Sequence, residues 1–325
     1  MSEGKLEIEA KIAKYLRLLE QDPNNVENHF KLGTLYLDED QHQLALIHFE
    51  NVLKLNPEDT YSMINLGNIH YKSGNIELAL KSYFQALSID DEDVDLLYNI
   101  ANLYEKSNDY KKAETYYMKV LDIDANHSKT WNNLGLLHTI NNDLEKAKYC
   151  FNKSFLLDPN SIETLNNLGE IHILTKDYLS AISYFNQIIS LKPNYASAWF
   201  NLGVIYEELK EIGNAEKHYQ EALKRSPIYS EALYRLETIL HDKGEIKKAI
   251  NIYNSILDNE DSNKSEIYYL LARAYSALKQ DEKAIEYLTI LIHDNRHINS
   301  YKEKILLDKT FIDLKKNINF MDLMK

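Results

Sequence analysis

Five asparagines recur along the chain at one constant interval. Each side-chain amide supplies both a hydrogen-bond donor and an acceptor, so a row of them can hold the backbone of an extended peptide without reading its sequence. Two lysines at the same interval would add positive charge to this row. The asparagines are Asn65, Asn99, Asn133, Asn167 and Asn201, and the lysines are Lys72 and Lys106. This pattern predicts recognition chemistry.

The residue types that carry catalysis are present without the spacing that catalysis needs. The sequence contains no G-x-S-x-G, P-loop, H-E-x-x-H or C-x-x-C motif. His70, His138 and His172 fall at one position of the same interval, but no cysteine or aligned carboxylate would complete a metal site with them. Cys150 has no evident activating neighbour, so we expect an inert thiol. These observations favour a protein that is not an enzyme and that uses no metal or cofactor.

Composition and charge restrict the partners further. The 325 residues are 44% hydrophobic and 27% charged, with a net charge of -13. Nucleic acid is an unexpected ligand, because its phosphates bind lysine and arginine. No apolar run approaches the roughly 18 residues of a membrane span, and no basic-then-apolar leader precedes the first helical pattern. A single cysteine fits a reducing compartment, so we expect a cytoplasmic protein.

The elements that position these residues follow the same period. The five prolines, five of the nine glycines and a long alanine series are separated by this interval or by a multiple of it. A constant period of about 34 residues is typical of a stacked repeat array. The alanines are Ala45, Ala79, Ala113, Ala147, Ala181, Ala215 and Ala249, and Ala284 follows one position late. The predicted repeats are 26–59, 60–93, 94–127, 128–161, 162–195, 196–229, 230–263 and 265–298.

Each repeat contains two stripes with the spacing of an α-helix. When positions are numbered from the start of a repeat, positions 4, 7, 8 and 11 form one stripe and positions 20, 24 and 27 form another. Small residues at positions 8 and 20 allow the two helices to approach closely, and a ring at position 24 fills the space beside them. Proline at position 32 ends the second helix. The sequence predicts an all-α fold of helical hairpins.

One repeat shows the full set of recurring residues. It contains Trp199, Leu202, Gly203, Tyr206, Ala215, Tyr219 and Pro227. These residues match a W-x2-L-G-x2-Y, A-x3-F and P pattern, and residues 26–298 therefore resemble the tetratricopeptide repeat family. The resemblance implies a right-handed superhelical solenoid whose first helices line a concave groove. It also implies that the groove binds a protein or peptide segment.

The two terminal segments are expected to close the array. A stack of repeats leaves an apolar face open at each end. Segments 1–25 and 299–325 both carry apolar residues at helical spacing, so we predict an N-terminal and a C-terminal capping helix. An undocked cap would also be a surface for weak self-association. The residues concerned are Ile8, Ile12, Tyr15 and Leu19 at one end, and Leu307, Phe311, Leu314, Ile318 and Met321 at the other.

If the chain follows the family, positions 2, 6, 9 and 13 of the first helices face the groove. The stripe changes from amides and lysines in repeats two and three to apolar side chains in repeats four to six. The predicted groove residues are Asn65, Asn68, Lys72, Tyr98, Asn99, Asn102, Lys106, Asn133, Leu136, Ile140, Asn167, Leu174, Phe200, Asn201, Val204 and Arg235. A purely structural role is the alternative for the asparagines, because asparagine at position 6 is common in the family.

The sequence therefore predicts a non-enzymatic scaffold that holds an extended or helical segment of a partner protein. The alternative is a regulatory subunit that docks substrates to a separate enzyme or assembly machine. Some family members clamp a C-terminal carboxylate with lysines, but Ile64 and Tyr98 stand where that clamp has lysine. A receptor for chaperone tails is therefore not expected. Eight repeats, one inserted residue and two terminal segments account for all 325 residues, so no catalytic domain is expected.

Overall fold

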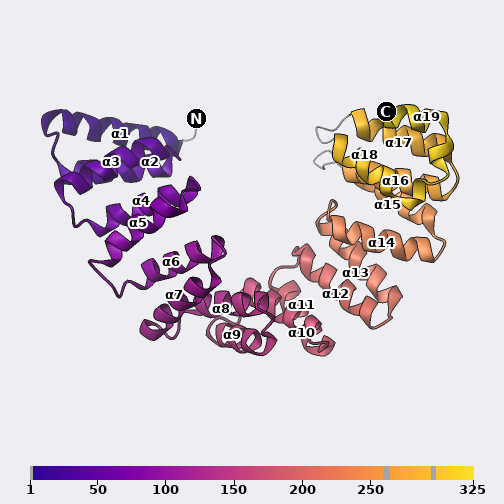
Figure 1. The fold of residues 1–325 in the computed structure, drawn as a ribbon, viewed down its shortest axis with the longest axis horizontal. Helices are drawn as coiled ribbons and strands as arrows, with labels where there is room; N and C mark the ends of the chain where they lie inside the picture. The colour runs from indigo at the N-terminus through magenta and orange to yellow at the C-terminus, as the bar shows by residue number, and fades with distance from the viewer. Residues whose placement is uncertain (1–2, 259–263, 294–297) are drawn as a thin grey trace. The chain divides into compact units, whose positions relative to one another are not determined.

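The computed structural model describes residues 3–258, 264–293 and 298–325. Over these residues the chain forms nineteen α-helices and two 3₁₀ turns, without a β-strand (Figure 1). Sixteen of the helices form eight hairpins, each closed by a short turn. The all-α solenoid of helical hairpins predicted from the sequence is confirmed. The chain divides into two compact units, Met1–Pro159 and Asn160–Lys325, which are described separately.

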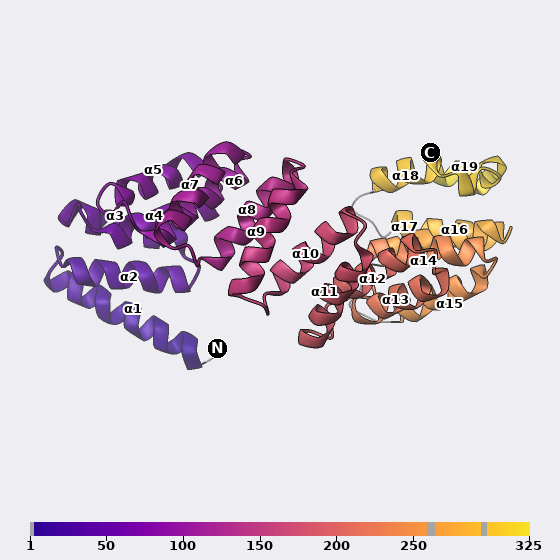
Figure 2. The same cartoon turned by 90° about the horizontal axis from the view of Figure 1, so that it is seen from below.

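The N-terminal unit consists of one unpaired helix followed by four hairpins. Helix α1 (Glu3–Gln21) lies beside the first hairpin (Figure 2), where Ile12, Tyr15 and Leu19 pack against its buried core. Each hairpin begins at the first residue of a repeat. The hairpins are α2 (Val26–Asp38) with α3 (His42–Leu55), α4 (Thr60–Lys72) with α5 (Ile76–Leu87), α6 (Val94–Lys106) with α7 (Tyr110–Ile123), and α8 (Ser128–Ile140) with α9 (Leu144–Leu157).

The C-terminal unit contains four more hairpins and a short terminal segment. Every first helix again begins where its repeat begins, and all four have the same length. The hairpins are α10 (Ile162–Leu174) with α11 (Tyr178–Leu191), α12 (Ala196–Glu208) with α13 (Ile212–Arg225), α14 (Ser230–Asp242) with α15 (Ile246–Leu257), and α16 (Ser265–Ala277) with α17 (Asp281–His293).

Local signals account for the ends of the helices. The carboxylate of Asp59 accepts a hydrogen bond from the backbone N–H of Ser62, and Asp93 caps α6 in the same way. In every hairpin turn one residue adopts a positive φ, such as Gly74 at 78° and Asn108 at 60°. A left-handed residue reverses the chain within a few residues. The turn therefore stays short, and the second helix folds back against the first.

The core of a typical hairpin is the contact between a glycine at position 8 and a ring at position 24. A Cβ atom on Gly67 would lie 2.3 Å from the ring of Tyr83, and one on Gly135 would lie 2.4 Å from Phe151. These distances leave no space for a side chain. The alanine at position 20 is equally enclosed, since Ala147 has no exposed surface. Close approach of two backbones therefore requires the small residues that recur in the sequence.

Enlarging the residue at position 20 should therefore destabilise the array. We expect Ala147→Leu to lower the free energy of unfolding by about 1–3 kcal/mol, because the added atoms force neighbouring side chains out of their preferred rotamers. Ala10→Leu, at an exposed site on α1, is the matched control. Thermal melting of both variants measures the difference. If Ala147→Leu melted at the same temperature as the unchanged protein, α8 and α9 would not pack in this register.

The C-terminal segment differs from the prediction of one continuous capping helix. It forms α18 (Ile298–Leu307), the 3₁₀ turns η1 (Lys309–Phe311) and η2 (Leu314–Lys316), and α19 (Ile318–Met324). The chain leaves the helix at Asp308, whose carboxylate accepts hydrogen bonds from the Thr310 backbone and from the Tyr269 hydroxyl. The Thr310 N–H is therefore not bonded to the Leu306 carbonyl, as it would be in a continued α18, and this carbonyl accepts a hydrogen bond from the Lys315 ammonium group instead.

The predicted apolar stripe of this segment is consequently split between core and solvent. Leu307, Ile318 and Met321 are 75%, 67% and 46% exposed, which corrects the expectation that they cover the last repeat. The segment lies beside α16 and α17 (Figures 1 and 2). Its buried side chains belong to the same core as these helices, and they are Ile305, Phe311, Leu314 and Phe320. The segment packs against the last hairpin, but with a different set of residues.

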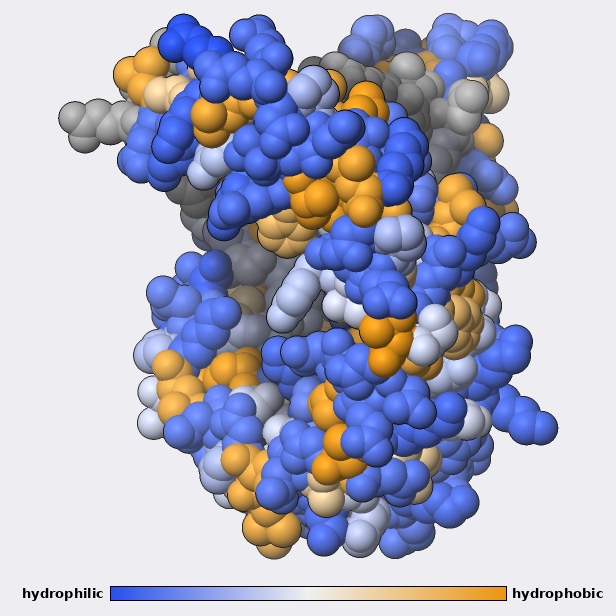
Figure 3. All heavy atoms as spheres, turned by 90° about the vertical axis from the view of Figure 1, so that its left-hand side faces the viewer, coloured by the Kyte–Doolittle hydropathy of each residue, from blue (hydrophilic) through white to orange (hydrophobic). Residues whose placement is uncertain are grey.

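The N-terminal unit is mainly hydrophilic on the face shown in Figure 3. Hydrophobic residues on this face form separate groups among hydrophilic ones. Scattered apolar residues are normal on a protein surface, whereas a large continuous patch marks an interface. Among the described residues, the face shown in Figure 3 therefore has no large continuous apolar patch of the kind that marks a hydrophobic docking surface.

Candidate functional site

The polar half of the predicted groove lies on α4, α6 and α8 of the N-terminal unit. In Figure 1 these helices lie on the inner side of the curve that this unit follows. They are in direct contact, because Lys106 of α6 lies over the ring of Tyr71 on α4, and Asn133 of α8 hydrogen-bonds to α6. We call this region the amide surface, and it consists of Asn65, Asn68, Lys72, Tyr98, Asn99, Asn102, Lys106 and Asn133.

Buried tyrosines hold the two asparagines at position 9 of the amide surface. The Tyr83 hydroxyl donates to Asn68 Oδ1 at 2.5 Å, and the Tyr117 hydroxyl lies 2.6 Å from Asn102 Oδ1. Burial raises the pKa of Tyr83 to about 12, and burial followed by the hydrogen bond to Glu105 raises the pKa of Tyr117 further. Both phenols therefore keep their protons, and the amide oxygens above them are fixed in orientation.

Asn133 links two neighbouring repeats. Its Nδ2 lies 3.1 Å from the hydroxyl of Tyr98, 3.1 Å from Asn102 Oδ1 and 3.0 Å from the hydroxyl of Tyr117. An amide nitrogen carries two hydrogens, so these contacts use its donor capacity. In repeat four the asparagine at position 6 therefore has a structural role, because Asn133 joins α8 to α6.

Asn65 and Asn99 occupy the same position in their repeats but make no such contacts. Both are half-buried. Within residues 3–258, 264–293 and 298–325, no hydrogen-bond partner is found for either side-chain amide, or for that of Asn201. Each of these amides therefore keeps a donor and an acceptor for a molecule outside the chain. The asparagine at position 6 therefore has a free amide in repeats two and three and a hydrogen-bonded one in repeat four.

Lys72 and Lys106 give the amide surface its positive charge. Each is exposed and lies in the last turn of its helix, where the backbone carbonyls favour a cation. The Lys106 ammonium group lies 4.8 Å from the centre of the Tyr71 ring. Among the side chains that the structure describes, no carboxylate forms an ion pair with either lysine. Their charge is therefore available to an anionic group of a partner.

The apolar half of the predicted groove is divided between the two units. Leu136 and Ile140 lie on α8, whereas Leu174 lies on α10, and Phe200 and Val204 lie on α12. Ile140 and Leu174 are 55% and 58% exposed, and the other three are half-buried. The ring of Phe200 packs against Tyr219 and Tyr229, with centroids 5.6 and 5.0 Å apart. The predicted apolar stretch is therefore described as two surfaces, one on each unit.

Arg235 and Asn167 differ from the free residues of the amide surface. Arg235 Nη1 lies 3.0 Å from Glu207 Oε1, and Glu207 also accepts a hydrogen bond from the Tyr219 hydroxyl at 2.7 Å. In this repeat Val204 replaces the asparagine at position 9, so the tyrosine reaches the glutamate at position 12 instead. The charge of Arg235 is compensated, and Asn167 is buried.

His172 and Cys150 are packing residues, whereas His70 and His138 are half-buried. His172 is buried, with Nδ1 2.9 Å from Asp177 and its ring beside Tyr184. Burial raises the pKa of the Cys150 thiol to about 11, so it stays protonated and unreactive at neutral pH. In the described part of the chain, no three histidine, cysteine or acidic side chains are placed to hold a metal ion.

Two features could have been found in the sequence but were not predicted. Rings at positions 11 and 23 stack within a repeat, and every repeat with a ring at position 23 also has one at position 11. The stacked pairs are Tyr36 with His48, Tyr104 with Tyr116, Tyr206 with His218, and Tyr275 with Tyr287. The second feature is Glu237, which interrupts the series of small residues at position 8.

Stacked hairpins of nearly constant length define an α-solenoid, in which each repeat packs mainly against its neighbours. Models of the tetratricopeptide repeat match residues 14–47, 67–108, 196–229 and 265–289. The chain belongs to the tetratricopeptide repeat family. A further model, described as the CABIN1 N-terminal domain, matches residues 96–211. Membership of this family supports a protein-interaction scaffold in general.

Several solved structures share the fold. The C-terminal part of a tetratricopeptide repeat protein from Cytophaga hutchinsonii is 18% identical, with a TM-score of 0.60 over 71% of this chain and 95% of that one. PilF from Pseudomonas aeruginosa is 16% identical, with a TM-score of 0.56 over 67% and 97%. A tetratricopeptide repeat protein from Parabacteroides merdae is 16% identical, with a TM-score of 0.53 over 79% and 99%.

Two further findings bear on function. A search of curated proteins found no significant match. None of the helices described is both long and apolar enough to cross a membrane. The function must therefore be inferred from the residues of the amide surface themselves.

Proposed function

We propose that this protein is a non-enzymatic scaffold that binds an extended or helical segment of a partner protein along the amide surface. The observation that carries this proposal is the free state of Asn65 and Asn99. Both amides are half-buried, yet neither has a partner in the described chain, while Asn68, Asn102 and Asn133 beside them are engaged. Neither amide is among the fully buried groups that lack a partner, so solvent reaches both, and a bound segment can pair with them in place of water.

The chemistry of the surface selects the kind of segment. The side-chain amides can pair with backbone C=O and N–H groups of an extended chain, which gives affinity with little sequence preference. Lys72 and Lys106 add attraction for a carboxylate, either an acidic side chain or a C-terminus. Apolar side chains of the segment would gain about 25 cal/mol for each Å² that contact with Leu136 and Ile140 removes from water.

The net charge of -13 opposes an acidic partner at long range. Charges more than a Debye length away, about 8–10 Å in physiological salt, are largely screened. The two lysines act at hydrogen-bonding distance and have no carboxylate partner of their own among the described residues, so they dominate the local interaction. The proposal therefore includes binding of an acidic or C-terminal group beside Lys72 and Lys106.

The proposal also covers the cellular compartment in which the protein acts. Cys150 is a buried free thiol and is the only cysteine in the chain. Free cysteines of this kind are typical of reducing compartments. We place the protein in the cytoplasm on this basis.

Charge reversal on the amide surface tests the proposal. Peptides selected from a random library on the full chain serve as the probe. We expect Lys72→Glu with Lys106→Glu to weaken acidic peptides at least about tenfold, because each lost charge-assisted hydrogen bond is worth roughly 1.5–3 kcal/mol. Asn65→Ala with Asn99→Ala should weaken all selected peptides to a smaller extent. Calorimetric titration measures both effects.

The matched control carries the same change of charge on the second helices. Lys81 of α5 and Lys111 of α7 are exposed lysines of the neighbouring elements. Lys81→Glu with Lys111→Glu should leave peptide binding unchanged in moderate salt. Equal losses in the two charge-reversal variants would show that binding follows net charge, and the amide surface would then not be the site.

A further inference from the structure

Repeat seven departs from the other repeats at position 8. The others carry glycine or alanine there, whereas repeat seven carries Glu237. In repeat six a Cβ atom on Gly203 would lie 2.5 Å from the ring of Tyr219, so the normal hairpin has no space for a side chain. In the described chain, α14 and α15 are accordingly the least closely packed pair of the eight hairpins. The glutamate separates the two helices.

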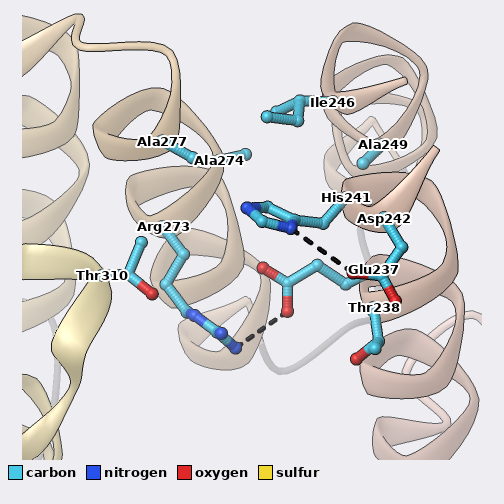
Figure 4. Close-up of a pocket in the computed structure, with 10 residues that line it drawn as sticks. All are labelled: Glu237, Thr238, His241, Asp242, Ile246, Ala249, Arg273, Ala274, Ala277 and Thr310. Atoms are coloured by element: carbon cyan, nitrogen blue, oxygen red, sulfur yellow. Dashed lines mark hydrogen bonds and ion pairs between the residues drawn. The ribbon is translucent and has the colours of Figure 1, made fainter. Parts of the chain in front are cut away.

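The separation leaves a cavity of about 190 Å³ bordered by α14, α15, α16 and η1 (Figure 4). Its wall has an apolar part, formed by Ile246, Ala249 and Ala277, and a polar part that includes Glu237, Arg273 and Thr310. A protein cavity of about 150 Å³ is large enough to hold benzene. The cavity can therefore hold a group that has both a short alkyl part and a polar head.

The Glu237 carboxylate is the central polar group of this cavity. One of its oxygens accepts a hydrogen bond from Arg273 Nη1 at 2.8 Å. The other is turned toward the space between α14 and α16 in Figure 4. Close by, the hydroxyl of Tyr253 is buried and has no hydrogen-bond partner in the described residues. The cavity thus contains an unused acceptor, and an unused hydroxyl lies near it without lining it.

The charges around the cavity determine the sign of a ligand. Arg273 is shared between two carboxylates, with Glu237 at 2.8 Å and Asp308 at 3.0 Å. The neighbouring Lys304 pairs with Glu266 at 3.0 Å. Together with Asp242, which also lines the cavity, four carboxylates therefore surround these two cations. An anion in the cavity would add to the negative surplus, whereas a cation would cancel it.

We propose that this cavity binds the head group of an alkylammonium or alkylguanidinium ion, with its charge on Glu237 and its alkyl chain against Ile246, Ala249 and Ala277. Lysine and arginine side chains have this combination of an apolar stem and a charged end. The site lies in the C-terminal unit and does not use the amide surface. It is therefore a second recognition site, independent of the function proposed above.

Binding at this site should depend on pH. Burial raises the pKa of Glu237 to about 7, so the empty site takes up a proton near neutral pH. A cation needs the ionised carboxylate. With a pKa of about 7, the ionised fraction rises about tenfold between pH 6 and pH 8, and the affinity should rise with it. The groups that face this carboxylate or its partners are Tyr234, His241 and Asp242 on α14, Tyr253 on α15, Glu266, Tyr269 and Arg273 on α16, and Lys304 and Asp308 in the terminal segment.

The experiment uses the full chain, with n-butylammonium, n-butylguanidinium and the neutral isostere n-butylurea as probes. Binding is followed by NMR chemical shifts at pH 6 and pH 8. We expect a butyl cation to bind about tenfold more tightly at pH 8, and butylurea to bind at neither pH. Glu237→Gln should abolish binding of the cation and its pH dependence. Glu208→Gln, an exposed change on α12, is the matched control and should alter neither.

A second variant distinguishes loss of the binding site from loss of the fold. Glu237→Gly restores the residue that five other repeats use at position 8, and it should close the cavity while circular dichroism shows unchanged helix content. A capped pentapeptide with a central arginine identifies the source of the cation. Tighter binding of the peptide than of butylguanidinium would indicate a partner's side chain, and equal binding would indicate a small free ion. Binding of butylurea as tight as that of the cations, or cation binding that survives Glu237→Gln, would overturn the proposal.

Discussion

A chain that lacks residues 299–325 should form dimers or larger aggregates where the full chain does not. The truncation removes Ile305, Phe311, Leu314 and Phe320, whose side chains are at most 1% exposed. Each large apolar side chain contributes about 1.5–3 kcal/mol when it leaves water, and the residues of α16 and α17 beneath them would become a new apolar surface. Light scattering on both chains measures the result. A truncated chain that stayed monomeric and soluble would show that the segment does not close the array.

Single substitutions at two neighbouring residues test the same contact between the terminal segment and the last hairpin. Phe311 is fully buried, with its ring packed against Tyr269 and Phe320, whereas Ile312 is 62% exposed. Phe311→Ala should lower the free energy of unfolding by about 3–5 kcal/mol, because it leaves a cavity in the core. Ile312→Ala should change it by no more than about 0.5 kcal/mol. Urea denaturation that gave the two variants equal stability would contradict the buried position of η1.

Ionisation of Glu237 should destabilise the protein as the pH rises from 4.5 to 7. Burial raises the pKa of this carboxyl from 4.5 to about 7 in the folded protein. The folded state therefore holds a proton that the unfolded state has already lost, and stability falls with pH until both states are ionised. The difference between the two pKa values corresponds to roughly 3 kcal/mol. Urea denaturation at several pH values measures this loss.

The comparison with Glu237→Gln isolates this contribution. Other titrating groups are shared by the two proteins, so the difference in unfolding free energy between them should change by roughly 2.5 kcal/mol from pH 5 to pH 7.5 in favour of the variant. Glu208→Gln should show no such change, because the side chain is exposed. Parallel stability curves for the unchanged protein and Glu237→Gln would show that Glu237 has an ordinary pKa.

The hairpins were predictable because their signal is repeated. Small residues at positions 8 and 20 occur once in almost every repeat, so each hairpin confirms the register of the next. The observed first helices begin at the first residue of every predicted repeat, such as Thr60 and Val94. A single helix with the same pattern would give a much weaker signal.

The structure of the C-terminal segment was less predictable, because its helical pattern occurs only once in the sequence. The spacing of Leu307, Phe311 and Leu314 is helical, but the chain bends at Asp308 because its carboxylate is held by Tyr269 and pairs with Arg273. Both partners lie in the preceding repeat, on α16, far from Asp308 in the sequence. Tertiary hydrogen bonds of this kind override local helical propensity, and no local pattern reveals them.

The helix that carries each asparagine was predictable, but the state of its amide was not. The stripe of asparagines follows directly from the helical period. Whether an amide is engaged depends on contacts across repeats, as between Asn133 and Tyr98. One signal was available, since a tyrosine at position 24 carries a hydroxyl that reaches position 9, whereas phenylalanine cannot. Tyr83 and Tyr117 show this difference from Phe151.

The constant length of the hairpins also affects how the gene can evolve. An in-frame duplication or loss of one ordinary repeat joins equivalent residues, so the new neighbours meet the same glycine and the same ring. Repeats six to eight are different. Glu216 of repeat six is buried and pairs with Lys243 and Lys248 of repeat seven. Glu237 of repeat seven pairs with Arg273 of the next repeat, and Arg273 pairs with Asp308 of the terminal segment. A copy inserted after repeat seven would separate these partners and leave buried charges unpaired, at a cost of about 3–5 kcal/mol. Selection should therefore allow the array to lengthen or shorten more readily before repeat six than after it.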